Sequence, residues 1–328
     1  MRGVTVHGIL LAVMLIFAYQ AWTPNETRPT TTNRDGSVTI WELSPDQVRA
    51  VTYERAGRTT TIVERREEQG KAYLWGRSFE PSPGDSSEET ATDEFPIGEQ
   101  GEDVWERLAH LRALRDLGVL DDAAKEQYAL NDTERRLTVS TAAAERILEV
   151  GGTVYATNHR YAFDPVSGRG YVLADQMVRA LEGASSTLRL QKLHRFSRDD
   201  VATVTVRGAL GERTMTRRAG AAGSADVWVS PDAPDEPDQT FENFMNHVQP
   251  LAFSSFAPTV SVDTMQFLVR IDYGGAAEAP IGFLEVYRVA VDQPGVWDYY
   301  LQTEATRIPA RAHRSLAERV DRDLAGLF

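Results

Sequence analysis

The chain has 328 residues, of which 42% are apolar and 9% aromatic, and its formal net charge is −13. This length and apolar content allow one large domain or two ordinary domains with hydrophobic cores. The acidity and the lack of any basic cluster argue against a nucleic-acid-binding protein. The absence of cysteine excludes disulfides, thiolate nucleophiles, iron–sulfur clusters, cysteine zinc sites and an acylated lipoprotein terminus.

The chain begins with a long apolar segment. Residues 4–22 read VTVHGILLAVMLIFAYQAW, and a helix of this length spans about 28 Å, close to the thickness of a bilayer core. Tyr19 and Trp22 lie at its end, where aromatic rings favour the membrane interface. We therefore expect residues 1–22 to form a single-pass transmembrane anchor in the cytoplasmic (inner) membrane, contacting lipid through residues 4–22. Arg2 precedes the apolar run and favours an N-terminus inside, with the remaining chain in the periplasm or extracytoplasmic space.

A cleaved signal peptide is the main alternative, and a buried helix of a soluble protein is another. Signal cleavage requires small residues at positions −3 and −1. Cleavage after Ala21 would place Tyr19 at −3, and cleavage after Ala18 would place Ile16 there. Neither site fits well, so an uncleaved anchor is favoured. Residues 23–36 are polar with two prolines and predict an extended tether.

Two stretches of the chain resemble each other. LSPDQVRAVTYER begins at Leu43 and FSRDDVATVTVRG begins at Phe196, an offset of 153. Without gaps, 11 of the 33 positions from Leu43 to Trp75 are identical at this offset, whereas unrelated segments would share about two. The sequence therefore predicts a duplicated unit. Ser44 and Asp46, with their counterparts Ser197 and Asp199, are interpreted as turn residues that cap local backbone N–H groups.

Further along, the offset between the copies falls from 153 to 136. Trp75 and Trp105 are 30 positions apart in the first copy, whereas Trp228 and Phe241 are 13 apart in the second, a difference of 17. The extra residues lie in a segment rich in acids, proline, glycine and serine, which predicts an acidic mobile loop at 78–103. The segment lacks the ligand spacing of a calcium loop.

From residue 37 onward the sequence predicts an α+β fold with two tandem, internally repeated, antiparallel-rich domains, 37–190 and 191–328. Alternating apolar and polar residues predict strands, and i, i+3, i+4 spacing predicts helices. The strands expected in the first domain are 48–55, 59–66, 71–76, 136–141, 146–152, 160–164 and 170–174. Its expected helices are 175–181 and 102–120, the latter with apolar Val104, Trp105, Leu108, Leu111 and Leu114.

The second domain is expected to follow the same order. Its predicted strands are 201–208, 213–218, 226–230, 266–274, 282–291 and 296–305, and its predicted helices are 239–248 and 310–327. The final helix carries Leu316, Val320 and Leu324 on one face. Trp75 and Trp228 occupy equivalent positions and are interpreted as core residues, because a ligand-stacking tryptophan would be expected in one copy only.

Three segments resemble a family that carries a domain of unknown function numbered 4340 (DUF4340), found in bacterial cell-envelope proteins with one N-terminal anchor. They are the turn and strand at 43–53 and again at 196–206, EQYAL at 126–130, and LRLQKLHRF at 188–196. Ala129 and Gln191 depart from the glycine and aspartate usual in the family. The resemblance covers residues 37–328 and implies an extracytoplasmic accessory of an ABC-type or gliding-type transport system.

No catalytic, cofactor-binding or metal-binding residue is predicted. The six histidines (His7, His110, His159, His194, His247 and His313) form no HxH, HExxH or HxxxH pattern, and no GxSxG, SxxK, Walker A or GxGxxG motif occurs. Residues 166–171, VSGRGY, are interpreted as a hairpin turn rather than a phosphate-binding loop. His159, Arg160 and Tyr161 are interpreted as a strand edge rather than a polar site.

The expected function is that of a membrane-anchored, non-enzymatic accessory or scaffold subunit of an ABC-type transport system. Its partners would be the permease and auxiliary transport subunits that the resemblance implies, through protein–protein interaction. The first alternative is a solute- or glycan-binding module with a cleft between the repeats lined by Tyr155, Tyr161, Tyr299 and Tyr300. The second is an exported hydrolase whose catalytic residues come from distant positions.

Overall fold

The computed structural model describes residues 36–56, 59–68, 70–79, 93–131, 133–219, 226–276 and 279–328. The predicted anchor at 1–22 and all of the predicted tether except Gly36 lie outside these residues, as do residues 80–92 of the predicted acidic loop. Within the described ranges, no helix is long and apolar enough to cross a membrane. The anchor and the membrane location that depends on it stay predictions.

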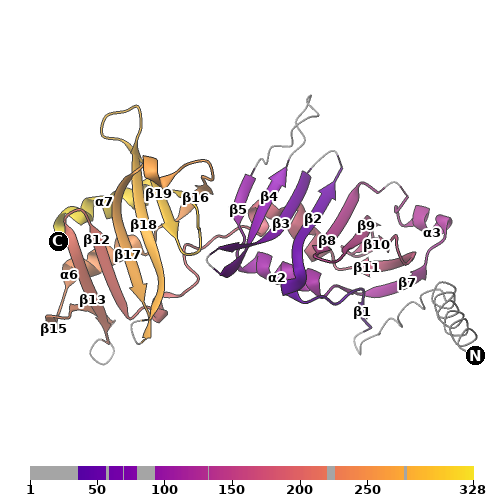
Figure 1. Cartoon of the computed structure of the whole chain (residues 1–328), viewed down its shortest axis with the longest axis horizontal. Coiled ribbons are helices and arrows are strands. Elements are labelled where there is room, and N and C mark those ends of the chain that lie inside the picture. The colour runs from indigo at the N-terminus through magenta and orange to yellow at the C-terminus, as the bar shows by residue number, and fades with distance from the viewer. Residues whose placement is uncertain are drawn as a thin grey trace, which may run out of the picture. The chain divides into compact units, whose positions relative to one another are not determined.

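Nine strands form the first sheet, in the spatial order β5-β4-β3-β2-β8-β9-β10-β11-β7 (Figure 1). They are β2 (Val48–Arg55), β3 (Thr59–Glu68), β4 (Lys71–Phe79), β5 (Asp93–Pro96), β7 (Arg115–Val119), β8 (Arg135–Thr141), β9 (Glu145–Thr153), β10 (Arg160–Asp164) and β11 (Arg169–Leu173). A separate antiparallel pair joins β1 (Val38–Thr39) to β6 (Arg112–Ala113).

Strand β2 shows how the sequence pattern produces a buried face. Val51 and Tyr53 alternate with polar residues and are buried, as the period of two in a strand requires. Val48 is buried as well, although it lies three positions before Val51. The register against β8 shifts between Val48 and Ala50, and this irregularity returns Val48 to the core face.

Nine strands also form the second sheet, in the order β15-β14-β13-β12-β17-β18-β19-β20-β16. They are β12 (Thr203–Gly208), β13 (Gly211–Arg218), β14 (Val227–Ser230), β15 (Ala233–Pro237), β16 (Phe253–Phe256), β17 (Gln266–Gly274), β18 (Pro280–Ala290), β19 (Trp297–Thr303) and β20 (Ala310–Ala312). Every pairing described in this sheet is antiparallel.

The two sheets share one strand order. Matching β5, β4, β3, β2, β8, β9, β10, β11 and β7 with β15, β14, β13, β12, β17, β18, β19, β20 and β16 makes the two orders coincide. A short 3-10 turn precedes the central strand of each, η1 (Pro45–Gln47) and η2 (Arg198–Asp200), at the offset of 153. Equivalent positions can therefore be assigned by this offset and by strand register.

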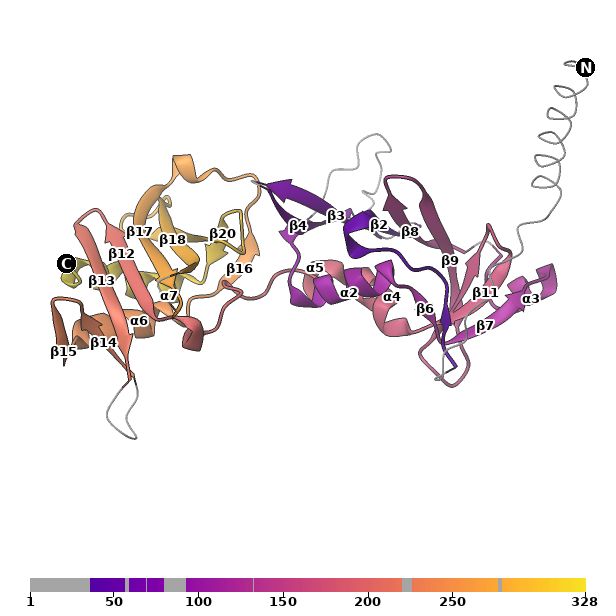
Figure 2. The same ribbon diagram turned by 60° about the horizontal axis from the view of Figure 1, so that its bottom comes forward.

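The longer helices are α2 (Glu99–Ala109), α3 (Asp122–Gln127), α4 (Asp175–Glu182), α6 (Gln239–Val248) and α7 (Arg314–Asp323), and the short ones are α5 (Ala184–Thr187), η3 (Val262–Thr264) and η5 (Leu324–Gly326). Helix α6 begins where the carboxylate of Asp238 accepts the Phe241 N–H at 2.9 Å, a typical N-cap. Helices α6 and α7 pack together beneath the strands of the second sheet (Figure 2) and add Phe241, Phe244 and Val320 to its core.

Two predicted helices were too long. The helix expected over 102–120 ends at Ala109, and residues 115–119 form β7, which pairs with β11. Leu114, which continued the helical spacing, is 43% exposed. The helix expected over 310–327 begins at Arg314, and β20 precedes it with Ala310 and Ala312 buried. In both places, long-range strand pairing prevails over local periodicity.

The predicted loop at 78–103 is partly regular structure. Its described residues include β5, which pairs with β4, and the first turns of α2. Strands β5 and β15 escaped prediction because they read DEFP and APDEP. Acidic and proline residues are typical of sheet edges, where one side of the strand needs no partner.

The chain is mostly β-structure with two large antiparallel sheets, and the prediction of antiparallel-rich architecture is confirmed in this coarse form. By packing, the chain divides into two compact units, one of residues up to Ala56 with Val104–Arg179 and the other of Gly57–Asp103 with Ala180–Phe328. This division falls within the first sheet. The predicted domain ranges 37–190 and 191–328 stay predictions.

Candidate functional site

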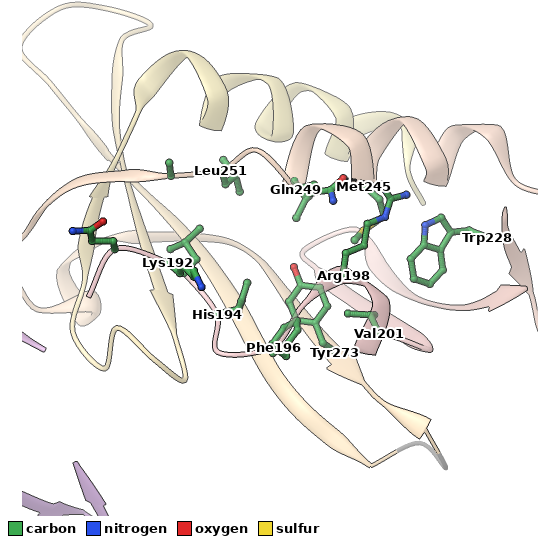
Figure 3. Close-up of a pocket in the computed structure, with 14 residues that line it drawn as sticks. Lys192, His194, Phe196, Arg198, Val201, Trp228, Met245, Gln249, Leu251 and Tyr273 are labelled. Carbon is green, nitrogen blue, oxygen red and sulfur yellow. Dashed lines mark hydrogen bonds between the residues drawn. The ribbon is translucent and has the colours of Figure 1, made fainter. Parts of the chain in front are cut away.

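A pocket of about 340 Å³ lies beside the second sheet (Figure 3). Three parts of the chain form its walls: the segment 191–201, which contains η2, the strands β14 and β17, and the end of α6 with the residues after it. The pocket is lined by Gln191, Lys192, Leu193, His194, Phe196, Arg198, Val201, Trp228, Met245, Val248, Gln249, Leu251, Ala252 and Tyr273.

Most of the wall is apolar and belongs to the core of the second sheet. Val201, Trp228, Val248 and Leu251 are all buried core residues, and Met245 packs against them. Trp228 meets the ring of Phe241 edge-on at 5.5 Å. Small-molecule pockets are typically apolar with a few polar groups that orient the ligand, and this pocket has that composition.

The hydroxyl of Tyr273 is one of the polar groups in the wall. The side chain is only 6% exposed, and its ring lies 5.0 Å from His194 and 5.1 Å from Phe196. Burial raises the pKa of Tyr273 well above its ordinary value, and the nearby Glu304 carboxylate raises it further. The phenol is therefore protonated at neutral pH and can both donate and accept a hydrogen bond.

Among the described residues, none forms a hydrogen bond with this hydroxyl. Figure 3 shows the oxygen pointing into the space below Gln249. The oxygen is not one of the described side-chain atoms that are fully buried without a partner, so it can be reached from the pocket. It can exchange hydrogen bonds with a ligand or water there.

Arg198 spans the pocket from η2 to the end of α6 (Figure 3). Its guanidinium donates to Gln249 Oε1 at 3.0 Å and lies 3.9 Å from Glu242 Oε1. The η2 turn that carries Arg198 is held by Asp200, whose carboxylate accepts the backbone N–H of Ser197 at 2.7 Å and its hydroxyl at 2.8 Å. These bonds keep the pKa of Asp200 below its ordinary value.

This turn corrects one expectation from the sequence. The capping interaction predicted for Asp46 and Asp199 is made by the residue that follows each, Gln47 in η1 and Asp200 in η2. Asp199 is instead in an ion pair with Arg217 at 3.3 Å. The prediction of a turn was right, and Ser44 and Ser197 form capping boxes as expected, with Gln47 and Asp200 as their partners.

Residues 193–196, which form part of the pocket wall, are attached to the end of β19 and to the loop after it. The backbone carbonyl of Leu193 accepts the Thr303 hydroxyl at 2.6 Å. His194 Nδ1 lies 3.1 Å from Glu304 Oε1, and Glu304 Oε2 also accepts the Phe283 N–H at 3.0 Å. The His194 ring stacks on Phe196 at 4.6 Å. These contacts fix the segment independently of α6.

The equivalent space beside the first sheet is filled. Trp41 stands at the position equivalent to His194, and its indole N–H donates to the carbonyl of Leu108 at 2.8 Å. The backbone N–H groups of Ile40 and Leu43 donate to the carbonyls of Leu111 and Ala109, both at 2.9 Å. In the described second sheet, no backbone hydrogen bond joins residues 193–196 to residues 245–252.

Three equivalent positions therefore differ between the sheets in a way that creates the pocket. Trp41 corresponds to His194, which has a smaller ring, and Pro45 corresponds to Arg198. Val139 faces Val51 across the first sheet, as Tyr273 faces Val204 across the second. The second sheet gains space, a cation and a phenol where the first has a packed indole, a proline and a valine.

The four tyrosines predicted to line a cleft have different local surroundings. Tyr155 is 93% exposed, and Tyr161 stacks on Tyr128 at 4.3 Å. Tyr299 and Tyr300 are adjacent in β19, so they point to opposite faces of the sheet. Tyr299 is buried and donates to Asp321 Oδ2 at 2.8 Å. The predicted cleft between the repeats stays a prediction.

Among the described histidines, His110, His194 and His247 have side-chain partners, whereas His159 Nδ1 is buried without one. His247 Nδ1 lies 2.6 Å from Asp323 Oδ2, between α6 and α7, and His110 Nδ1 lies 3.3 Å from the Glu106 carbonyl. No group of three or more His, Asp or Glu residues within the described ranges could hold a metal ion. His7 lies outside those ranges. Arg160, predicted to lie on a strand edge, pairs with buried Asp175 at 2.8 Å.

The remaining predicted features take the expected local form. Trp75 and Trp228 are both buried, and Trp228 also borders the pocket. Residues 164–169 form the turn between β10 and β11, in which Gly168 has a φ of 70° and Asp164 Oδ1 accepts the Val166 N–H at 2.9 Å. The interpretation of this segment as a hairpin turn is confirmed.

Comparisons with protein-family models, curated proteins and solved structures found no match. The resemblance to the DUF4340 family stays a prediction.

Proposed function

We propose that this chain is a non-enzymatic binding protein whose ligand occupies the pocket beside the second sheet. The observation that carries this proposal is the difference between equivalent positions. Trp41 fills the space beside the first sheet and is bonded to Leu108, whereas His194 leaves a pocket of about 340 Å³ beside the second. That volume lies within the range of small-molecule sites, about 300–1,000 Å³.

We also propose that the two sheets descend from one duplicated unit, each an α+β domain. Their common strand order and the offset of 153 between η1 and η2 support this. In such a pair, the first copy would serve a structural role, because its equivalent space is packed. The second copy would carry the binding function, because its substitutions open the same space.

Binding is favoured over hydrolysis by the pocket's residues. Among the described residues that line it, none is a serine, threonine, cysteine, aspartate or glutamate. Acyl-transfer enzymes need a nucleophile and a base within hydrogen-bond reach of each other in the site. Lys192, His194 and Tyr273 can act as nucleophiles or bases, but among the described hydrogen bonds none joins two of them. Lys192 and His194 pair with Glu99 and Glu304 instead, which supports a binding role.

We place this binding protein, as a proposal, in an extracytoplasmic accessory role for an ABC-type transport system. The apolar segment at 4–22 and the resemblance at 43–53, 126–130 and 188–206 support that placement. Its partners would be the permease or auxiliary subunits, and it would hold a ligand near them at the inner membrane. Pull-down of the full chain from detergent tests this role, and recovery of no permease or ATPase subunit would contradict it.

Thermal unfolding of the full chain with a panel of small apolar carboxylates, alcohols and amines tests the binding function. We expect at least one class to raise the Tm of the wild-type protein, because a ligand that binds only the folded state stabilises it. His194→Trp and, separately, Met245→Trp should fill the pocket and remove the shift. No shift with any class, or an equal shift in both filled variants, would refute the proposed site.

A further inference from the structure

We infer that the ligand of this pocket is a small amphipathic anion, with an apolar acyl or aryl body and one anionic head group. This inference rests on the binding function proposed above and adds the chemical class of the ligand. It follows from the sign of the charges at the pocket, from the position of Arg198, and from the free hydroxyl of Tyr273.

The charged residues that line the pocket have one sign. Lys192 and Arg198 are cations, and among the described lining residues none is an acid. Each cation has an acidic partner outside the lining: Lys192 Nζ lies 3.2 Å from Glu99 Oε2, and the Arg198 guanidinium lies 3.9 Å from Glu242 Oε1. A cationic lining favours an anionic ligand over a neutral or cationic one of the same shape.

Arg198 is suited to contact the head group. It replaces the proline of the first sheet's turn, and its guanidinium reaches across the pocket to Gln249 at 3.0 Å. A guanidinium has five N–H donors, and the bond to Gln249 uses only part of this capacity. A carboxylate at the mouth could accept from the same group in a charge-assisted hydrogen bond, which is stronger than a neutral one.

Tyr273 supplies the second contact. The residue is buried, and its hydroxyl points into the pocket with no hydrogen-bond partner among the described residues. Because the phenol remains protonated, it can donate to an anionic oxygen. The apolar body would then lie against Trp228, Met245 and Leu251, which line the same space.

Calorimetric titration of the full chain in detergent, with empty micelles as the blank, tests this inference. The probes are 4-phenylbutyrate, 4-phenylbutan-1-ol and 4-phenylbutylamine, which share one body and differ in the head group. We expect the carboxylate to bind at least about tenfold more tightly than the alcohol, and the amine to bind most weakly. Arg198→Gln should remove the preference for the carboxylate over the alcohol.

Tyr273→Phe keeps the ring and removes only the hydroxyl, so we expect carboxylate binding to weaken by about 2- to 10-fold. Arg207→Gln and Tyr287→Phe are matched controls in the same sheet outside the pocket and should leave binding unchanged. If the alcohol and the carboxylate bind equally well and His194→Trp blocks both, the inference of an anionic ligand is refuted. The pocket would still be a binding site. Binding of none of the three probes, together with no shift in the panel of small molecules above, would refute the binding function itself.

Discussion

Trp41 and His194 occupy equivalent positions 153 residues apart and contact different partners. The indole of Trp41 donates to the carbonyl of Leu108 near the end of α2, whereas the imidazole of His194 pairs with Glu304 in the loop after β19. One side chain therefore closes the space between its segment and the neighbouring helix, and the other leaves that space open.

The first prediction concerns Trp41. Trp41→His should destabilise the protein by about 3 kcal/mol, because it removes a buried ring and the hydrogen bond to Leu108. Urea unfolding monitored by circular dichroism measures this change. His194→Trp is the reciprocal control and should cost far less, since the ring enters existing space. Equal losses in both variants would contradict the assigned difference in packing.

A second prediction concerns the ion pair beneath the first sheet. Asp175 is 5% exposed and is paired with Arg160 at 2.8 Å and with Arg179 one turn along α4. Arg160→Ala should destabilise by about 3 kcal/mol or more, because it leaves a buried carboxylate without its inner partner.

Arg179→Ala is the matched control for this pair, because its side chain is 59% exposed and exposed pairs contribute only about 0–1 kcal/mol. Chemical unfolding of both variants measures the two losses. If Arg179→Ala lowers the free energy of unfolding as much as Arg160→Ala, the burial of the arginine does not determine the loss of stability.

The third prediction is a pH dependence at Asp298. A hydrogen bond from Arg314, with the charge of Arg311 beside it, lowers the pKa of Asp298 below its ordinary value, against a smaller opposing effect of burial. A carboxyl group with a lowered pKa in the folded state stabilises the fold above its unfolded pKa of about 3.9, and this contribution is lost as the pH falls through the folded value. Asp298→Asn should therefore lower the Tm at pH 7.

The difference between wild type and Asp298→Asn should shrink as the pH falls below about 4. Thermal unfolding of both proteins between pH 3 and pH 7 measures it. Asp232→Asn, in the exposed turn between β14 and β15, should show no such dependence. A Tm difference that stays constant across this range would rule out the ion pairs of Asp298 as its origin.

The fourth prediction tests the domain ranges 37–190 and 191–328. Val51 and Val204 are equivalent, fully buried residues of β2 and β12. Either change to alanine should cost about 2 kcal/mol through lost burial and a small cavity. If the ranges are separate domains, calorimetry should resolve two transitions, and each variant should shift a different one. A shift of both transitions by either variant would contradict separate domains.

Much of the second sheet could be predicted from local pattern. Helix α6 and strand β17 have the predicted ends, 239–248 and 266–274, because their periodicity is strong and Asp238 marks the start of the helix. Strand β16 was missed because its four residues are too short to show a period. The overlong helix after Ala109 was predicted because Leu111 and Leu114 extend the helical spacing, while the pairing of β7 with β11 is invisible in local sequence.

The pocket was not predicted, although part of its signal is in the sequence. The comparison at offset 153 counted identities, whereas the site depends on differences, Trp41 against His194 and Pro45 against Arg198. Tyr273 could not be distinguished from a core tyrosine, because its lack of a partner is a property of three-dimensional packing. That Val139 and Tyr273 are equivalent could be recognised only from the strand registers, because each faces the equivalent valine, Val51 or Val204.

The attachment of residues 193–196 to Thr303 and Glu304 determines how the pocket can admit a molecule. Among the described contacts, the link from η2 to the end of α6 consists of the side chain of Arg198, bonded to Gln249 and near Glu242. A rotamer change of this one arginine, which takes picoseconds to nanoseconds for exposed side chains, would therefore separate η2 from the end of α6. Beside the first sheet, the backbone hydrogen bonds of Ile40 and Leu43 would have to break before the equivalent segments could separate. A molecule could therefore enter there only after local unfolding.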